Sequence, residues 1–165
     1  MKKIVVVFVV ILTALMLFSC GSAPASPRLE GEVTQERVNE VLGQIYDIYR
    51  GRLDLTGAQE HIVVSGDTLS AITRRFYGNL TNVGDAGTNN GFHFPVIMMA
   101  TGSHIVDPEL IEPGMRLVIP DLRRNLDNPN SRQAIKDTLI NVAHVYERKG
   151  RPAEEAGLIR LANSL

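Results

Sequence analysis

The stretch from residue 61 to residue 120 constrains the fold more than any other part of the chain. It opens with the run 61–64, in which His61 is followed by three β-branched residues, and continues with a glycine turn and with apolar residues at helical spacing over 68–76. It closes with a Pro-Gly turn that starts a second apolar run at 116–119, and a proline ends that run. This order predicts two short strands that bracket a helical middle.

We expect strand 61–64 to pair antiparallel with strand 116–119. Two short strands alone are marginally stable, so two helices, at 68–76 and 95–101, must cover them. Pro95 suits a helix start, where its missing N–H costs nothing. The expected core consists of the apolar side chains of these elements and their loops: Leu69, Ile72, Phe76, Val96, Ile97, Met99, Leu110, Ile111, Leu117 and Ile119.

Two segments carry a resemblance to a known family. Residues 64–72 read Val-Ser-Gly-Asp-Thr-Leu-Ser-Ala-Ile, and residues 107–120 read Asp-Pro-Glu-Leu-Ile-Glu-Pro-Gly-Met-Arg-Leu-Val-Ile-Pro. In this order they resemble the LysM module, a small βααβ domain that binds N-acetylglucosamine-containing glycans, chiefly peptidoglycan in bacteria and chitin in eukaryotes. The resemblance covers 60–121 and implies an α+β fold with a two-stranded antiparallel sheet.

The chain departs from the family pattern in two places. Thr101 stands where LysM modules usually carry an asparagine whose amide braces the following loop. A polar passage rich in glycine and asparagine, at 79–93, is longer than a helix connection usually needs. It is either a flap beside the site or a surface insertion.

The resemblance implies a glycan groove between the loop after the first strand and the loop before the second. The residues mapped onto the first wall are Gly66, Asp67, Thr68 and Leu69, and those mapped onto the second wall are Asp107, Pro108, Glu109, Leu110 and Ile111. Each also has a structural interpretation. Asp67 or Thr68 suits a helix cap, Pro108 can stiffen a turn, and Leu110 and Ile111 can belong to the core.

The N-terminus has the features of an export signal. Residues 1–19 join a basic start to a 15-residue uncharged apolar run, which is shorter than the roughly 20 residues of a membrane span. Cys20, the only cysteine, follows in a context that resembles a bacterial lipobox, which implies that 1–19 is removed and Cys20 is acylated. The alternative is an uncleaved anchor with an incidental thiol. Residues 20–33 have the composition of a linker.

Charge argues against some partners. Loss of Lys2 and Lys3 with the signal leaves 15 basic and 18 acidic residues, a net charge of −3, without a basic stripe. Neither nucleic acid nor an anionic lipid surface is therefore an expected partner.

Helices are expected on both sides of the module. Apolar residues recur every three or four positions over 34–52, with Thr34 as the cap, and indicate an amphipathic helix. Residues 130–165 predict a helical hairpin, capped by Asn130 or Ser131 and turning at Gly150. These helices either pack on each other and on the module, or form a surface for a partner protein. Residues 121–129 read as a polar, turn-rich connection.

The sequence offers little for catalysis. The histidines are scattered without metal-ligand spacing, and no nucleophile motif is present. We therefore expect no enzyme activity, no metal and no cofactor.

These features together predict a lipid-anchored protein of the bacterial cell envelope, at the periplasmic face or the cell surface, that binds peptidoglycan without turnover. The alternative is a helical adaptor that recruits an envelope protein such as a cell-wall hydrolase, with the module as a folded spacer.

Overall fold

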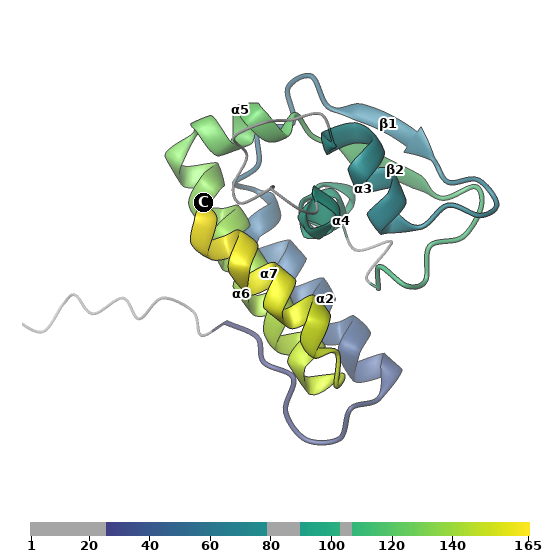
Figure 1. Ribbon diagram of the computed structural model, residues 1–165, viewed down its shortest axis with the longest axis vertical. Coiled ribbons are helices and arrows are strands. Elements are labelled where there is room, and N and C mark those ends of the chain that lie inside the picture. The colour runs from purple at the N-terminus through teal and green to yellow at the C-terminus, as the bar shows by residue number, and fades with distance from the viewer. Residues whose placement is uncertain (1–25, 79–89, 103–106) are drawn as a thin grey trace, which may run out of the picture.

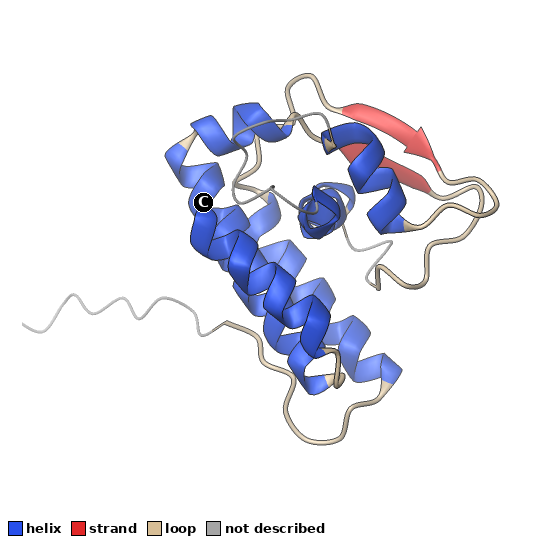
Figure 2. Ribbon diagram, in the orientation of Figure 1, coloured by secondary structure: helices blue, strands red, loops and turns tan. Residues whose placement is uncertain are grey.

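The computed structural model describes residues 26–78, 90–102 and 107–165. The elements follow in the order α2 (Gln35–Arg50), β1 (Gln59–Ile62), α3 (Leu69–Tyr77), the 3-10 helix η1 (Asn90–His93), α4 (Phe94–Thr101), β2 (Arg116–Ile119), α5 (Leu122–Asp127), α6 (Pro129–Arg148) and α7 (Pro152–Ser164). The sheet and α3 lie at one end of the molecule, and α2, α6 and α7 run alongside one another at the other (Figure 1). The fold is α+β, as the sequence predicts (Figure 2).

The two strands form one antiparallel sheet, with Gln59 opposite Ile119 and Ile62 opposite Arg116. The predicted pairing is confirmed, but the first strand lies two residues earlier than predicted. Val63 still exchanges backbone hydrogen bonds with Met115 and Gly114, at 2.9 and 2.8 Å. The Val64 carbonyl accepts instead from the Asp67 amide at 3.0 Å, so the turn begins there and ends the ladder.

Helix α3 begins one residue later than predicted, because Thr68 is its N-cap. The Thr68 hydroxyl accepts from the Ala71 amide at 3.2 Å, which satisfies an amide that the first turn leaves free. Phe76, expected in the core, is only partly buried, whereas Tyr77 is buried and donates its hydroxyl to the Pro120 carbonyl at 3.0 Å.

Helix α4 lies between the sheet and the other helices (Figure 1), and all eight of its residues are buried. A helix that is apolar on every side needs cover on every side, and β2, α2 and α6 supply it. Pro95 occupies its first turn, as predicted. At its last residue, the Thr101 hydroxyl accepts from the Val118 amide at 2.9 Å, so a hydroxyl at the position of the family's asparagine braces strand β2.

The flanking helices pack on each other. The apolar stripe of α2 lies against α6 and α4, which confirms the packing alternative for that stripe. Helix α6 begins two residues earlier than predicted, because Asn128 is its cap and Pro129 fits its first turn. Gly150 adopts φ +70°, as predicted for a left-handed turn, and α7 starts at Pro152. The buried residues of α2 are Val38, Val41, Leu42, Ile45, Tyr46 and Tyr49.

Two further expectations were wrong. The connection at 121–129 contains helix α5, which Asp121 caps by accepting from the Arg124 amide at 3.0 Å and which buries Leu122 and Leu126. Leu110, expected in the core, is 51 % exposed; it lies in a turn in which its amide donates to the Asp107 carbonyl at 3.0 Å.

No helix within the described ranges is long and apolar enough to cross a membrane. The expected signal at 1–19 and Cys20 lie outside those ranges, as do residues 79–89 of the long insertion.

Candidate glycan-binding site

A pocket of about 290 Å³ lies where the two predicted loops meet. This volume is near the lower end of the range usual for small-molecule sites, about 300 to 1,000 Å³. Its lining comes from both predicted walls, from η1 and α4, and from the corner between α6 and α7: Asp67, Thr68, Leu69, Ser70, Gly91, Phe92, Phe94, Pro108, Glu109, Ile111, Tyr146, Arg151 and Glu154. The structure therefore brings together the loops that the sequence placed on either side of a groove.

The first wall is a tight turn fixed by the Asp67 carboxylate. Its Oδ2 accepts from the Val64 amide at 3.1 Å and lies 2.9 Å from His61 Nε2, and its Oδ1 is 3.4 Å from an Arg75 nitrogen. The hydrogen bond from His61, the Val64 amide and the positive charge of Arg75 hold the Asp67 pKa below its usual range. Gly66 permits the turn, because its φ is +88°.

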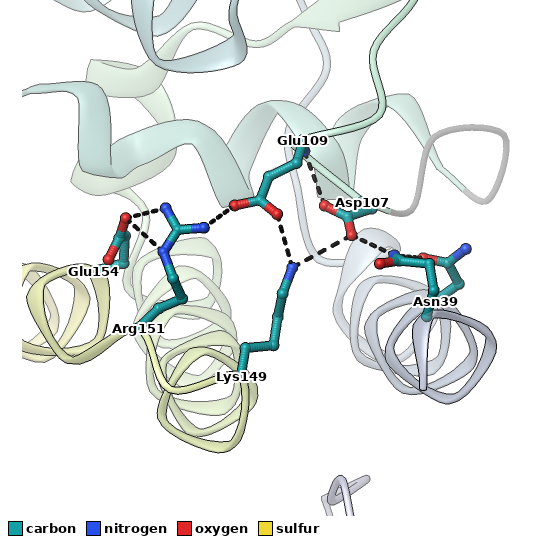
Figure 3. Close-up of polar contacts among 7 residues, drawn as sticks. Asn39, Asp107, Glu109, Lys149, Arg151 and Glu154 are labelled. Carbon is teal, nitrogen blue, oxygen red and sulfur yellow. Dashed lines mark hydrogen bonds and ion pairs between the residues drawn. The ribbon is translucent and has the colours of Figure 1, made fainter. Parts of the chain in front are cut away.

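The second wall is tied to the flanking helices (Figure 3). The Asp107 carboxylate is 2 % exposed; it accepts from Gln35 Nε2 at 2.5 Å and from the Glu109 amide at 2.8 Å, and lies 3.4 Å from Lys149 Nζ. Glu109 accepts from Lys149 at 3.0 Å and from Arg151. These contacts hold the loop at 107–111 against α2 and against the turn between α6 and α7.

The predicted site residues thus have different positions. Thr68 and Leu69 combine a place in the pocket lining with a helix cap and a core position respectively. Gly66, Asp107 and Leu110 do not line the pocket: Gly66 shapes the turn, Asp107 lies buried behind the wall, and the Leu110 side chain points to solvent.

Sequence reasoning missed the lining from η1, α4 and the α6–α7 corner. Phe92 and Phe94 supply apolar surface, and Tyr146 packs edge-on against Phe94 with ring centroids 6.0 Å apart. Arg151 and Glu154 add charged groups. The Gly150 turn was visible in the sequence, but nothing in the spacing showed that this corner meets the loop at 107–111.

A short two-stranded sheet, two covering helices and a pocket between their connecting loops define the class of small βααβ binding modules. The family model for the LysM domain matches residues 61–89, which include part of β1, the first wall and α3. The chain therefore contains a LysM domain, a module that binds N-acetylglucosamine-containing glycans such as peptidoglycan.

Two curated relatives share part of the sequence. Esterase MT1326 and Esterase Rv1288, from two strains of Mycobacterium tuberculosis, are each 38 % identical over 73 residues, which is 44 % of this chain. The match spans only 13 % of the length of either relative, so their names describe proteins much larger than the shared segment. No solved structure matches the chain significantly.

Proposed function

We propose that this protein is a lipid-anchored lipoprotein of the bacterial cell envelope that holds peptidoglycan non-covalently through its LysM domain. The observation that carries the proposal is the pocket between the loops at 67–70 and 108–111, where the resemblance places the glycan groove. The pocket combines apolar surface with a few fixed polar groups, the arrangement that sugar recognition needs.

The proposed anchor strengthens a weak site. A single shallow module binds glycan weakly, but an acylated Cys20 would confine the module to the space beside the cell wall. Once the lipid anchor holds the protein, binding of the module to peptidoglycan takes place at a high effective concentration, which compensates for its low affinity. The export signal at 1–19 and the lipobox-like context of Cys20 support this part of the proposal.

No enzyme activity is part of the proposal. The LysM domain is a binding domain, and the esterase relatives share only a small part of their length with this chain. In the part of the chain that the structure covers, no group of three His, Cys, Asp or Glu side chains could hold a metal ion. In the adaptor alternative the apolar stripe of α2 was a possible docking surface for a partner. That stripe is buried within the protein, so it is not exposed to a partner.

A sedimentation assay tests the proposal. The full chain in detergent micelles is mixed with insoluble peptidoglycan and centrifuged, with a parallel sample that lacks peptidoglycan. We expect the protein to pellet only with peptidoglycan and chitotetraose to release it. Protein that stays in the supernatant would reject the proposal.

Ser70→Trp locates the interaction. Ser70 is exposed and lines the pocket, so a tryptophan there should fill the space without disturbing the core. Asn163→Trp is the control. Asn163 is also exposed, but it lies nine residues after Glu154 on α7, about 13.5 Å along the helix axis at 1.5 Å per residue, and it does not line the pocket. We expect Ser70→Trp to abolish sedimentation and the control to retain it. Binding that survives Ser70→Trp would place the glycan elsewhere.

A further inference from the structure

One side of the pocket comes from outside the LysM module. Tyr146 lies near the end of α6, Arg151 lies in the turn before α7, and Glu154 lies in the first turn of α7. We call these three residues the corner residues. They stand on the same pocket as Asp67 and Glu109, which come from the two loops of the module.

Local structure fixes the position of the corner residues. The Arg151 amide donates to the Tyr146 carbonyl at 2.9 Å and the Gly150 amide to the Glu147 carbonyl at 3.0 Å, around a Gly150 φ of +70°. This pattern of a glycine-terminated helix turns the chain sharply, and Pro152 then starts α7 at once. Tyr146 and Glu154 are thereby brought to the same side of the corner.

Three neighbouring side chains hold the Tyr146 ring in place. Phe94 packs against it edge-on, and the Lys149 Nζ and Arg151 Cζ atoms lie 5.4 and 5.9 Å from its centroid. Cations over an aromatic face are attracted to it, so these contacts keep the ring in place. Because Tyr146 is only 3 % exposed, its ring forms a fixed floor under this side of the pocket.

Arg151 joins the corner to the second wall. Its guanidinium donates to Glu109 in the loop and to Glu154 in α7, as Figure 3 shows. The Glu154 side chain is 29 % exposed, so its carboxylate is reachable from the pocket. The hydrogen bond from Arg151 lowers the pKa of Glu154. A glutamate is ionised at neutral pH, so this carboxylate acts only as a hydrogen-bond acceptor.

We propose that the corner residues form a third wall of the glycan site, in which Glu154 accepts hydrogen bonds from sugar hydroxyls and the buried Tyr146 supports the wall from beneath. Arg151 is a positioning residue that holds Glu154 and Glu109 in place. This inference rests on the proposed function and extends it, since it makes the C-terminal hairpin part of the binding site.

The charges of the pocket define the sugar class. Three carboxylates, Asp67, Glu109 and Glu154, line it against the single cation Arg151, a formal charge of −2. The Arg151 guanidinium already donates to two of these carboxylates, so few of its N–H groups are left to bind an anionic ligand. Asp67 and Glu109 are also paired with Arg75 and Lys149, so the charged groups of the lining offer carboxylate acceptors more than they offer cations. The third wall therefore suits the hydroxyl groups of an uncharged sugar better than an acidic sugar.

Two measurements on the full chain in detergent micelles test the third wall, with chitotetraose as the ligand. The first is calorimetric affinity for the wild type, Glu154→Gln and Glu155→Gln. Glu155 is the matched control, because it is the next residue on α7 and does not line the pocket. We expect about tenfold weaker binding for Glu154→Gln, as the loss of a hydrogen bond to a charged group implies, and less than twofold change for the control.

The second measurement separates contact from support. In the wild type, the carboxyl ¹³C resonance of Glu154 should shift on addition of chitotetraose, and that of Glu155 should not. If the wild type binds but Glu154→Gln binds equally well, or if the Glu154 carboxyl resonance does not move, the third wall is refuted and the proposed function stands. If the wild type does not bind, both are refuted.

Discussion

Glu109, in the second wall of the pocket, accepts a hydrogen bond from Lys149 Nζ at 3.0 Å. The two residues are 40 positions apart, and they join the loop at 107–111 to the end of α6. The flanking helices are therefore part of what shapes the pocket, and changes in them should affect the loop.

Removal of the Asp107 carboxylate should destabilise the protein. Asp107→Ala removes a buried carboxylate that accepts from Gln35, Lys149 and the Glu109 amide. Lys149 keeps Glu109 as an acceptor and Gln35 keeps Asn39, so the main loss is at the Glu109 amide, at a cost of about 1 to 3 kcal/mol. Urea denaturation followed by circular dichroism measures the loss. Asp47→Ala, at an exposed position on α2, is the control and should change stability little. Equal effects of the two substitutions would mean that the Asp107 contacts contribute nothing.

Gly157→Ala should disturb the contact between α7 and η1. A Cβ at this position would overlap the ring of Phe92, which packs directly over Gly157 and lines the pocket. Displacing the ring should cost about 1 to 3 kcal/mol, the range for an overpacked site, and weaken glycan binding.

Gly51→Ala is the matched control for this substitution. Its φ is −65° and an added Cβ meets no atom within 4 Å, so thermal unfolding should occur at the same or a slightly higher temperature. A Gly157→Ala protein as stable as this control, with the Phe92 ring resonances unshifted, would contradict the close packing.

Thr101→Val tests the brace that replaces the family's asparagine. Valine has the same shape but cannot accept from the Val118 amide, which then stays unsatisfied beside the core at a cost of about 1 to 3 kcal/mol. Thr101→Ser retains the hydroxyl and should lose less. Chemical denaturation of the three proteins gives the comparison, and a Thr101→Val protein more stable than Thr101→Ser would show that the methyl group matters more than the hydrogen bond.

The first wall should loosen in acid. The folded-state pKa of Asp67 is lowered, so the stability that its carboxylate contributes is complete above the ordinary aspartate pKa of about 3.9 and is lost as pH falls through the lowered value. The difference in melting temperature between the wild type and Asp67→Asn should therefore be constant above about pH 5 and shrink below about pH 4. A difference that stays constant down to pH 2 would contradict this.

Local sequence signals predicted the elements well. Strand and helix periodicity, Thr34 as a cap, Pro95 at a helix start and Gly150 at a turn all correspond to the structure, because each depends on neighbouring residues. The errors are also local in origin. Leu122 and Leu126 have helical spacing, but the polar residues around them favoured a turn interpretation of what became α5.

The composition of the pocket was predictable only in part. The two walls came from the family resemblance, but Phe92, Tyr146 and Glu154 reach the site through packing between distant elements. Such contacts come from the packing of α7 on α6 and on η1, and no spacing in the sequence encodes them. Asp107, predicted for the groove, lies behind the wall instead, where it accepts a hydrogen bond from Gln35 of α2.

The central claim is that sugar binds between the two loops of the LysM domain. The most direct test is titration of the isotope-labelled full chain with chitotetraose, followed by the backbone amide resonances. The account predicts saturable shifts concentrated in residues 67–70 and 109–111, with little change along α2. Saturable shifts confined to other surfaces, or none at millimolar chitotetraose, would contradict it.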